Sequence, residues 1–265
     1  MSTVSTARDT WSPAQERRRE WFQLAIVFGV SLGASAVYSV VSILRRLAAA
    51  EALKDQTATI NKPLALDPIF DLVYQLLGIG FALFPVALAL YFLWQPGRNP
   101  FRDIGLDFRK PWRNLGGGIA LAAAIGIPGI GLYLIGHAAG ITVTIVPTAL
   151  NTYWWTTPVL VLAALKAALQ EEIIVVAFLF AKLRNLGARP WLIIAVSALV
   201  RGSYHLYQGF GPFIGNALMG VVFGWAYLRW GRVMSLVIAH WILDIVSFTG
   251  YAVVAALAPG FLPGT

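Results

Sequence analysis

The chain of 265 residues is 58% hydrophobic and only 12% charged, with a mean hydropathy of +0.71. Soluble domains carry about 25% charged residues, so this composition excludes an ordinary soluble protein and predicts an all-α, polytopic transmembrane helix bundle in the plasma membrane. The absence of cysteine excludes disulfides and thiolate metal sites. The net charge of +8 is typical of basic cytoplasmic loops. Because no basic face is interleaved with exposed aromatic residues, we expect no nucleic-acid partner.

Seven apolar stretches are long enough to span a bilayer, which requires about 20 helical residues. They are residues 21–44, 69–94, 115–135, 158–183, 190–207, 210–228 and 233–257. A polar stretch, residues 1–20, precedes them, and we interpret it as a cytoplasmic tail. With this tail inside, most Lys and Arg residues fall in the inner loops, so the positive-inside rule predicts an N-in, C-out topology. The chain thus divides into the tail, N-terminal transmembrane helices over 21–135 and a second helical unit over 158–257.

Two adjacent carboxylates, Glu171 and Glu172, lie in the middle of the fourth stretch. A charged side chain near the centre of a bilayer costs roughly 3 kcal/mol on insertion scales. The pair therefore needs protein, water or counter-charges around it. Because successive residues of an α-helix point about 100° apart, we expect that the two glutamates cannot face the same partner equally.

Two later stretches carry polar pairs at helical spacing. Arg201 and His205 are four residues apart, and so are His240 and Asp244, so each pair is expected to share one helix face. Three helices then present polar side chains to a common interior. Helix–helix hydrogen bonds in membranes average only about 0.6 kcal/mol, which is little reason to bury several ionisable groups. We interpret the group as a functional site.

These side-chain types suit hydrolysis of a peptide bond inside the membrane. One glutamate of a closely spaced pair can act as the general base that activates a water. His205 could position that water or the leaving group. His240 and Asp244 could polarise the carbonyl group and stabilise the oxyanion.

The second half of the chain resembles the CPBP intramembrane protease family, also called the Abi or type II CAAX prenyl endopeptidase family. The family pattern is EExxxR on one helix, FxxxH on a following helix, and HxxxN or HxxxD on a later one. Glu171-Glu172 matches the first motif, His205 matches the histidine of the second motif, and His240 with Asp244 matches the last motif.

This resemblance implies an intramembrane endopeptidase with residues 158–257 as its CPBP-like catalytic core. Its substrate would be a membrane-embedded or membrane-associated peptide or protein in the lipid bilayer. The family roles carried over to this chain make Glu171 the base and Glu172 its assistant. They make His205 the residue that orients the water, and they place His240 and Asp244 around the oxyanion.

Two positions depart from the family pattern. The arginine of EExxxR is Val176 here, and the phenylalanine of FxxxH is Arg201. A guanidinium is lost from one helix and another appears on its neighbour. We hypothesise that Arg201 supplies the counter-charge that the missing arginine would have given to Glu172. The alternative is a degenerate, inactive site.

Other functions remain open from the sequence. Glutamate, histidine and aspartate are competent metal ligands, but the chain lacks the HExxH arrangement. We therefore expect no cofactor and keep a divalent-metal-dependent protease as an alternative. A non-catalytic membrane scaffold, or an immunity or regulatory protein, is a second alternative. Intramembrane acids and histidines also form the proton relays of transporters, although no duplicated half is visible in the sequence.

Overall fold

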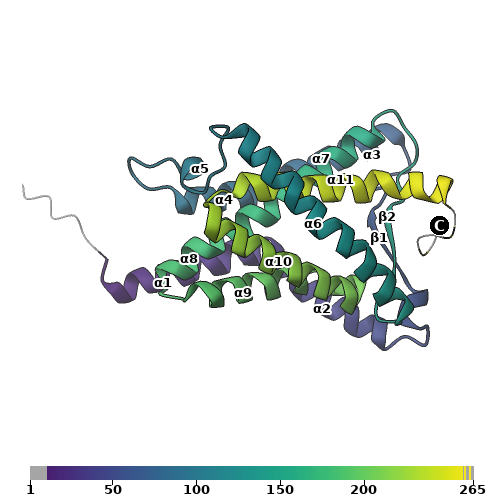
Figure 1. Cartoon of the computed structure of the whole chain (residues 1–265), viewed down its shortest axis with the longest axis horizontal. Helices are drawn as coiled ribbons and strands as arrows, with labels where there is room; N and C mark the ends of the chain where they lie inside the picture. Colours follow the sequence, from purple (N-terminus) through teal and green to yellow (C-terminus); the bar gives the residue numbers. More distant parts are fainter. Residues whose placement is uncertain (1–10, 259, 261–262, 264–265) are drawn as a thin grey trace, which may run out of the picture.

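Helices dominate the structure and occupy all seven stretches in which the sequence predicted them (Figure 1). The computed structural model describes residues 11–258, 260 and 263, so the first ten residues of the predicted tail lie outside the described part. The first helix, α1 (Pro13–Gly29), begins within the predicted tail. It begins there because Ser12 and Gln15 cap it reciprocally and because a proline occupies its first position.

The remaining elements follow in chain order. The first half contains α2 (Leu32–Leu47), α3 (Pro68–Ala82), α4 (Phe84–Leu93), the short α5 (Pro100–Asp103) and α6 (Pro111–Ala138). The second half contains α7 (Thr156–Glu171), the π-helix η2 (Glu172–Phe178), α8 (Leu179–Asn185), α9 (Pro190–Ser203), α10 (Phe210–Trp230) and α11 (Val233–Leu257). Two single-turn 3₁₀ helices, η1 (Leu53–Asp55) and η3 (Leu206–Gln208), lie in connections.

Several helices are long and apolar enough to cross a membrane. Within the described residues these are Pro68–Leu93, Pro111–Ala138, Phe210–Trp230 and Val233–Tyr251. The pair α1 and α2, bent by 56° at its junction, adds a fifth if it forms one span. The other two predicted stretches are helical but do not qualify, because α7–η2–α8 carries several charges and α9 has only 14 residues. The structure is thus that of a helical, multi-pass membrane protein with four or five clear spans.

A two-stranded parallel sheet, which the all-α prediction did not include, joins two long connections (Figure 1). Strand β1 (Thr57–Asn61) pairs with β2 (Thr144–Thr148), with the first residues of the two strands opposite each other. The side-chain amide of Asn61 donates to the backbone oxygen of Pro147 at 2.8 Å. The sheet therefore links the segment after α2 to the segment after α6, which are far apart in the sequence.

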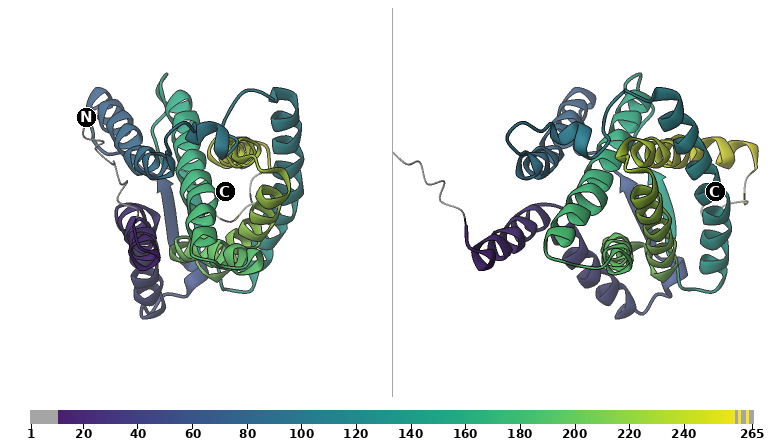
Figure 2. Two further views of the ribbon diagram at one scale, coloured as in Figure 1. Left: turned by 90° about the vertical axis from the view of Figure 1, so that its left-hand side faces the viewer. Right: turned by 60° about the vertical axis from the view of Figure 1, so that its left-hand side comes forward.

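The α7–η2–α8 segment runs through the middle of the molecule. It lies between α1–α4 on one side and α6, α10 and α11 on the other (Figure 2). Every residue of η2 is buried. The backbone oxygen of Val175, within η2, accepts a hydrogen bond from the Ser197 hydroxyl of α9 at 2.8 Å. π-Helical turns are rare and occur often at functional sites, so this turn, which begins at Glu172, marks a candidate site.

Arg232, just before α11, anchors the loop between α5 and α6. Its guanidinium donates to Oδ1 of Asp107 at 2.7 Å and to Oδ1 of Asn114 at 2.7 Å. The hydrogen bond from Arg232 holds the pKa of Asp107 below its usual range. Gly105 lets the two segments approach, because a Cβ at this residue would lie 2.5 Å from Cα of Arg232.

We expect Gly105→Ala to destabilise the protein more than Gly97→Ala. Both glycines have a positive φ, 70° and 75°, so alanine meets a similar backbone strain of roughly 1–2 kcal/mol at each. A Cβ at Gly97 enters open space, whereas one at Gly105 overlaps the backbone next to α11, and that overlap adds roughly 1–3 kcal/mol. Thermal unfolding of the two variants in detergent measures the difference. Equal losses would contradict the close packing at Gly105.

Candidate active site

Arg201, near the end of α9, bridges the two glutamates. Its Nη2 atom lies 2.6 Å from Oε1 of Glu172, and its Nη1 atom lies 3.3 Å from Oε2 of Glu171. The side chains of Arg201 and Glu172 have no solvent-exposed surface. A guanidinium stays protonated in proteins, so it brings a permanent positive charge to two buried carboxylates. Arg201 is thus placed where the sequence hypothesis requires a counter-charge.

Helix α10 provides the space for this guanidinium. The guanidinium carbon of Arg201 lies 5.4 Å from the ring centroid of Phe223, within cation–π range. A Cβ at Gly220 would lie 2.8 Å from Cα of Ala198 and 3.4 Å from Cδ of Arg201. Glycine at this position therefore lets α10 pack closely on α9 and leaves room for the arginine side chain.

His240, on α11, lies among three carboxylates. Its Nδ1 atom is 2.7 Å from Oε1 of Glu172, and its Nε2 atom is 3.5 Å from Oδ2 of Asp244 and 4.0 Å from Oε2 of Glu171. Ionised carboxylates only accept hydrogen bonds, so both ring nitrogens are in positions that suit N–H donors. The structure brings His240 and Asp244 together with the paired glutamates.

The two glutamates differ in their surroundings. The Glu171 side chain is 11% exposed, whereas that of Glu172 is fully enclosed. Within the described part of the chain, the hydrogen bonds to Glu171 end on Oε2, from the Tyr204 hydroxyl at 2.8 Å and from Arg201. Its other carboxylate oxygen, Oε1, is left free to meet a water or a substrate.

Tyr204 is a site residue that the sequence reasoning missed. It lies three residues after Arg201, a spacing that places two side chains on neighbouring parts of a helical turn. Its side chain is almost completely buried and its hydroxyl reaches Glu171. The sequence did contain one signal, the three-residue spacing between Arg201 and Tyr204. An aromatic residue in an apolar stretch is, however, equally expected as part of the hydrophobic core.

His205 lies in the turn after α9 and not on the helix, so the prediction that it shares a helix face with Arg201 was wrong. Helix α9 ends at Ser203, and His205 immediately precedes η3. The chain leaves the helical path because the backbone N–H of Tyr207 donates to the Ser39 hydroxyl of α2 at 2.7 Å. A tertiary contact thus ends a helix that the apolar pattern continues.

The imidazole of His205 nevertheless faces the site region. Its ring centroid is 4.9 Å from that of Tyr204, whose hydroxyl binds Glu171. Both ring nitrogens are buried without a hydrogen-bond partner among the described residues. An imidazole in this situation can bind a water beside Glu171.

A divalent cation fits this group poorly. Glu171, Glu172 and His240 each offer a ligand atom, and these atoms lie within 4.8 Å of one another. However, Arg201 already binds oxygens of both glutamates. A cation between these ligands would lie against a guanidinium whose charge cannot be removed.

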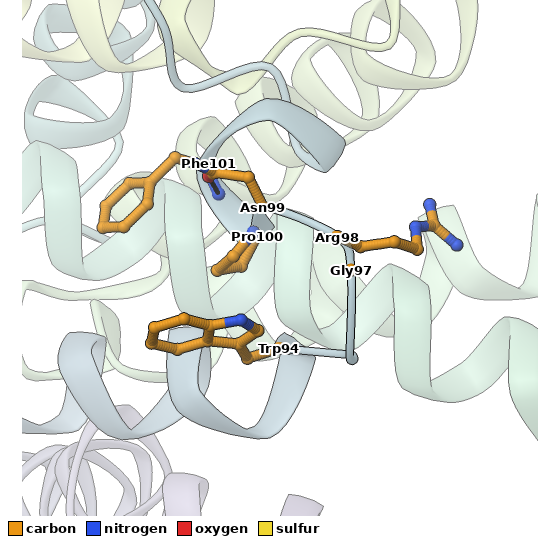
Figure 3. Close-up of a pocket in the computed structure, with 6 residues that line it drawn as sticks. All are labelled: Trp94, Gly97, Arg98, Asn99, Pro100 and Phe101. Carbon is orange, nitrogen blue, oxygen red and sulfur yellow. Dashed lines mark hydrogen bonds between the residues drawn. The ribbon is translucent and has the colours of Figure 1, made fainter.

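A surface pocket of about 370 Å³ lies outside this site, in the connection between α4 and α5. Trp94 lies on one side of it and Pro100 and Phe101 on the other (Figure 3). The guanidinium of Arg98, at its edge, pairs with Asp103 at 3.1 Å. None of the predicted site residues lines this pocket, so the pocket is not assigned to the active site. The candidate active site is the cluster around the paired glutamates.

Residues 153–246 match the family described as type II CAAX prenyl endopeptidase Rce1-like. This segment is Rce1-like. The match confirms the family resemblance found in the sequence, and it covers α7 to α10, the first part of α11 and every predicted site residue. The searches of curated proteins and of solved structures found no match to the chain. The Rce1-like segment implies a protease that acts on a peptide substrate in a membrane.

Arg201→Leu is expected to lower the free energy of unfolding by roughly 3–5 kcal/mol, because it leaves two buried carboxylates without their cation. Adding Glu172→Gln should recover part of this loss, since it removes one of the uncompensated charges. Unfolding in detergent of the wild type, both single variants and the double variant measures the coupling. Arg184→Leu, at an exposed arginine of α8, serves as the control. Strictly additive losses would show that Arg201 and Glu172 do not stabilise each other.

Proposed function

We propose that this protein is an intramembrane endopeptidase that hydrolyses a peptide bond of a membrane-associated substrate with a water activated by Glu171. One observation carries the proposal. The Glu171 side chain is 11% exposed and its Oε1 accepts no hydrogen bond from the described residues, whereas the Glu172 side chain is fully enclosed and its unpartnered oxygen, Oε2, is buried. A general base needs such an oxygen within hydrogen-bond reach of the water. The Rce1-like match of the surrounding helices supports the reaction class.

The proposed reaction begins when Oε1 of Glu171 takes a proton from a water whose oxygen attacks the carbonyl carbon of the peptide bond. His205 orients that water through a free ring nitrogen. The Nε2–H group of His240 donates to the oxyanion that forms. Glu172 orients the imidazole through its other nitrogen, Nδ1, at 2.7 Å, and Asp244, 3.5 Å from Nε2, lies beside the oxyanion position. Glu171 then passes the proton to the leaving amide nitrogen, which restores the carboxylate.

Glu172 assists without taking part in proton transfer. Its Oε1 atom binds both the Arg201 guanidinium and Nδ1 of His240. It therefore connects the residue that neutralises the glutamates to the residue that binds the oxyanion. Rigid support of this kind keeps catalytic groups within the narrow range of geometry that the reaction requires.

The proposed topology retains seven spans in the plasma membrane, with the N-terminus inside and the C-terminus outside. The described start of α1, the α5 connection and the turn after α8 lie at one end of the molecule, and the C-terminal end of α11 lies at the other (Figure 1). The first of these ends carries basic residues of the predicted inner loops, which supports its assignment to the cytoplasm.

A non-catalytic relative is the competing function. The absence of an arginine at Val176 favours it, since such a protein need not keep the family's charge arrangement. A scaffold, an immunity or regulatory protein, or a proton-coupled transporter would use the same helices without cleaving a peptide. Removal of the proposed base separates these functions from proteolysis.

Glu171→Gln is expected to slow cleavage of a farnesylated CAAX peptide in proteoliposomes by roughly 10²–10⁴-fold, the usual contribution of a general base. Glutamine keeps the size of the side chain and an oxygen that can accept the Tyr204 hydrogen bond. Glu51→Gln, at an exposed glutamate far from the site in sequence, should leave the rate unchanged. Full activity of Glu171→Gln would refute the proposed base, and a scaffold would keep its cellular effect in this variant.

Proteolysis is expected to survive exhaustive chelation with EDTA and 1,10-phenanthroline. This experiment tests the alternative function, a divalent-metal-dependent protease with Glu171, Glu172 and His240 as ligands. In such a protease the metal would act as a Lewis acid. The guanidinium of Arg201 on the same carboxylates disfavours that arrangement. Loss of activity on chelation, restored by added zinc, would favour the metal-dependent protease.

A further inference from the structure

The phenol of Tyr204 makes the shorter of the two hydrogen bonds that Glu171 receives. Its hydroxyl lies 2.8 Å from Oε2, whereas Nη1 of Arg201 lies 3.3 Å from the same atom. Charge-assisted N–H···O bonds are usually about 2.7–2.9 Å long. Arg201 makes its short contact, 2.6 Å, with Glu172 instead. Tyr204 is therefore the main donor to Glu171.

A carboxylate held by one weak contact would turn readily. The terminal torsion of glutamate is broad and roughly two-fold, so either oxygen of Glu171 could face Arg201 or His240 without a second donor. Tyr204 removes this freedom, because its ring is buried and packs against His205 at 4.9 Å between centroids. The phenol cannot follow the carboxylate if the carboxylate turns.

We propose that Tyr204 is a positioning residue for proteolysis: it holds Oε2 of Glu171 and so keeps Oε1 as the oxygen that takes the proton from water. This inference rests on the proposed function. Tyr204 acts through Glu171 and does not contact the peptide, since its hydroxyl is used by the carboxylate. Its effect should therefore appear in the rate of the chemical step and not in substrate binding.

Tyr204→Phe, which removes only the hydroxyl, tests this role in proteoliposomes with a farnesylated CAAX peptide. We expect kcat to fall roughly 10- to 100-fold, as for the loss of a hydrogen bond to a charged group, while KM changes by less than about twofold. Tyr207→Phe is the matched control, because Tyr207 lies three residues further along the chain, in η3, and its hydroxyl accepts from Gln208. An unchanged kcat for Tyr204→Phe, or a rise in KM alone, would overturn the proposal.

Infrared spectroscopy of the purified protein adds a test that needs no cleavage. The carboxylate stretch of Glu171, identified as the band that Glu171→Gln removes, should shift in Tyr204→Phe and stay in place in Tyr207→Phe. An unshifted band would show that Tyr204 does not hold this carboxylate. If the wild type cleaves no peptide, the proposed function is refuted. The infrared result still decides separately whether Tyr204 holds the carboxylate of Glu171 in place.

Discussion

The contact between Arg201 and the paired glutamates is the interaction on which the centre of this structure depends. Two adjacent carboxylates in an apolar helix cannot be buried without a compensating charge. The guanidinium that meets both of them comes from a different helix, α9. The contact therefore neutralises the buried charge and also joins α9 to the helix that runs through the middle of the molecule. The same atoms define the candidate site, so stability and chemistry are coupled here.

That contact also makes two chemically identical residues different. Glu172 is enclosed and binds Arg201 and His240 through one oxygen. Glu171 is partly exposed and is approached by its described partners from one side only. Environment, and not residue type, thus separates a supporting carboxylate from one that can react. The family resemblance named both residues, but it did not explain why the first should be the base.

Two local irregularities bring the site together. The turn that begins at Glu172 is π-helical, which changes the angle between neighbouring side chains from the value expected for an α-helix. Helix α9 stops early, so Tyr204 and His205 belong to a turn and not to a continuing helix, and the Tyr204 hydroxyl of this turn reaches Glu171.

The sequence by itself determined that the seven apolar stretches are helical, because about 20 apolar residues in a row have few other stable arrangements in a bilayer. It also identified the buried acids and their histidine partners, since ionisable residues in such stretches need a reason to be there. Only the tertiary structure decided where α9 ends, because the apolar pattern runs on through Tyr207 while a hydrogen bond to Ser39 of another helix redirects the chain. It likewise decided the pairing of β1 with β2 and the reach of Tyr204 to Glu171. These features depend on contacts between residues distant in sequence, which no local pattern encodes.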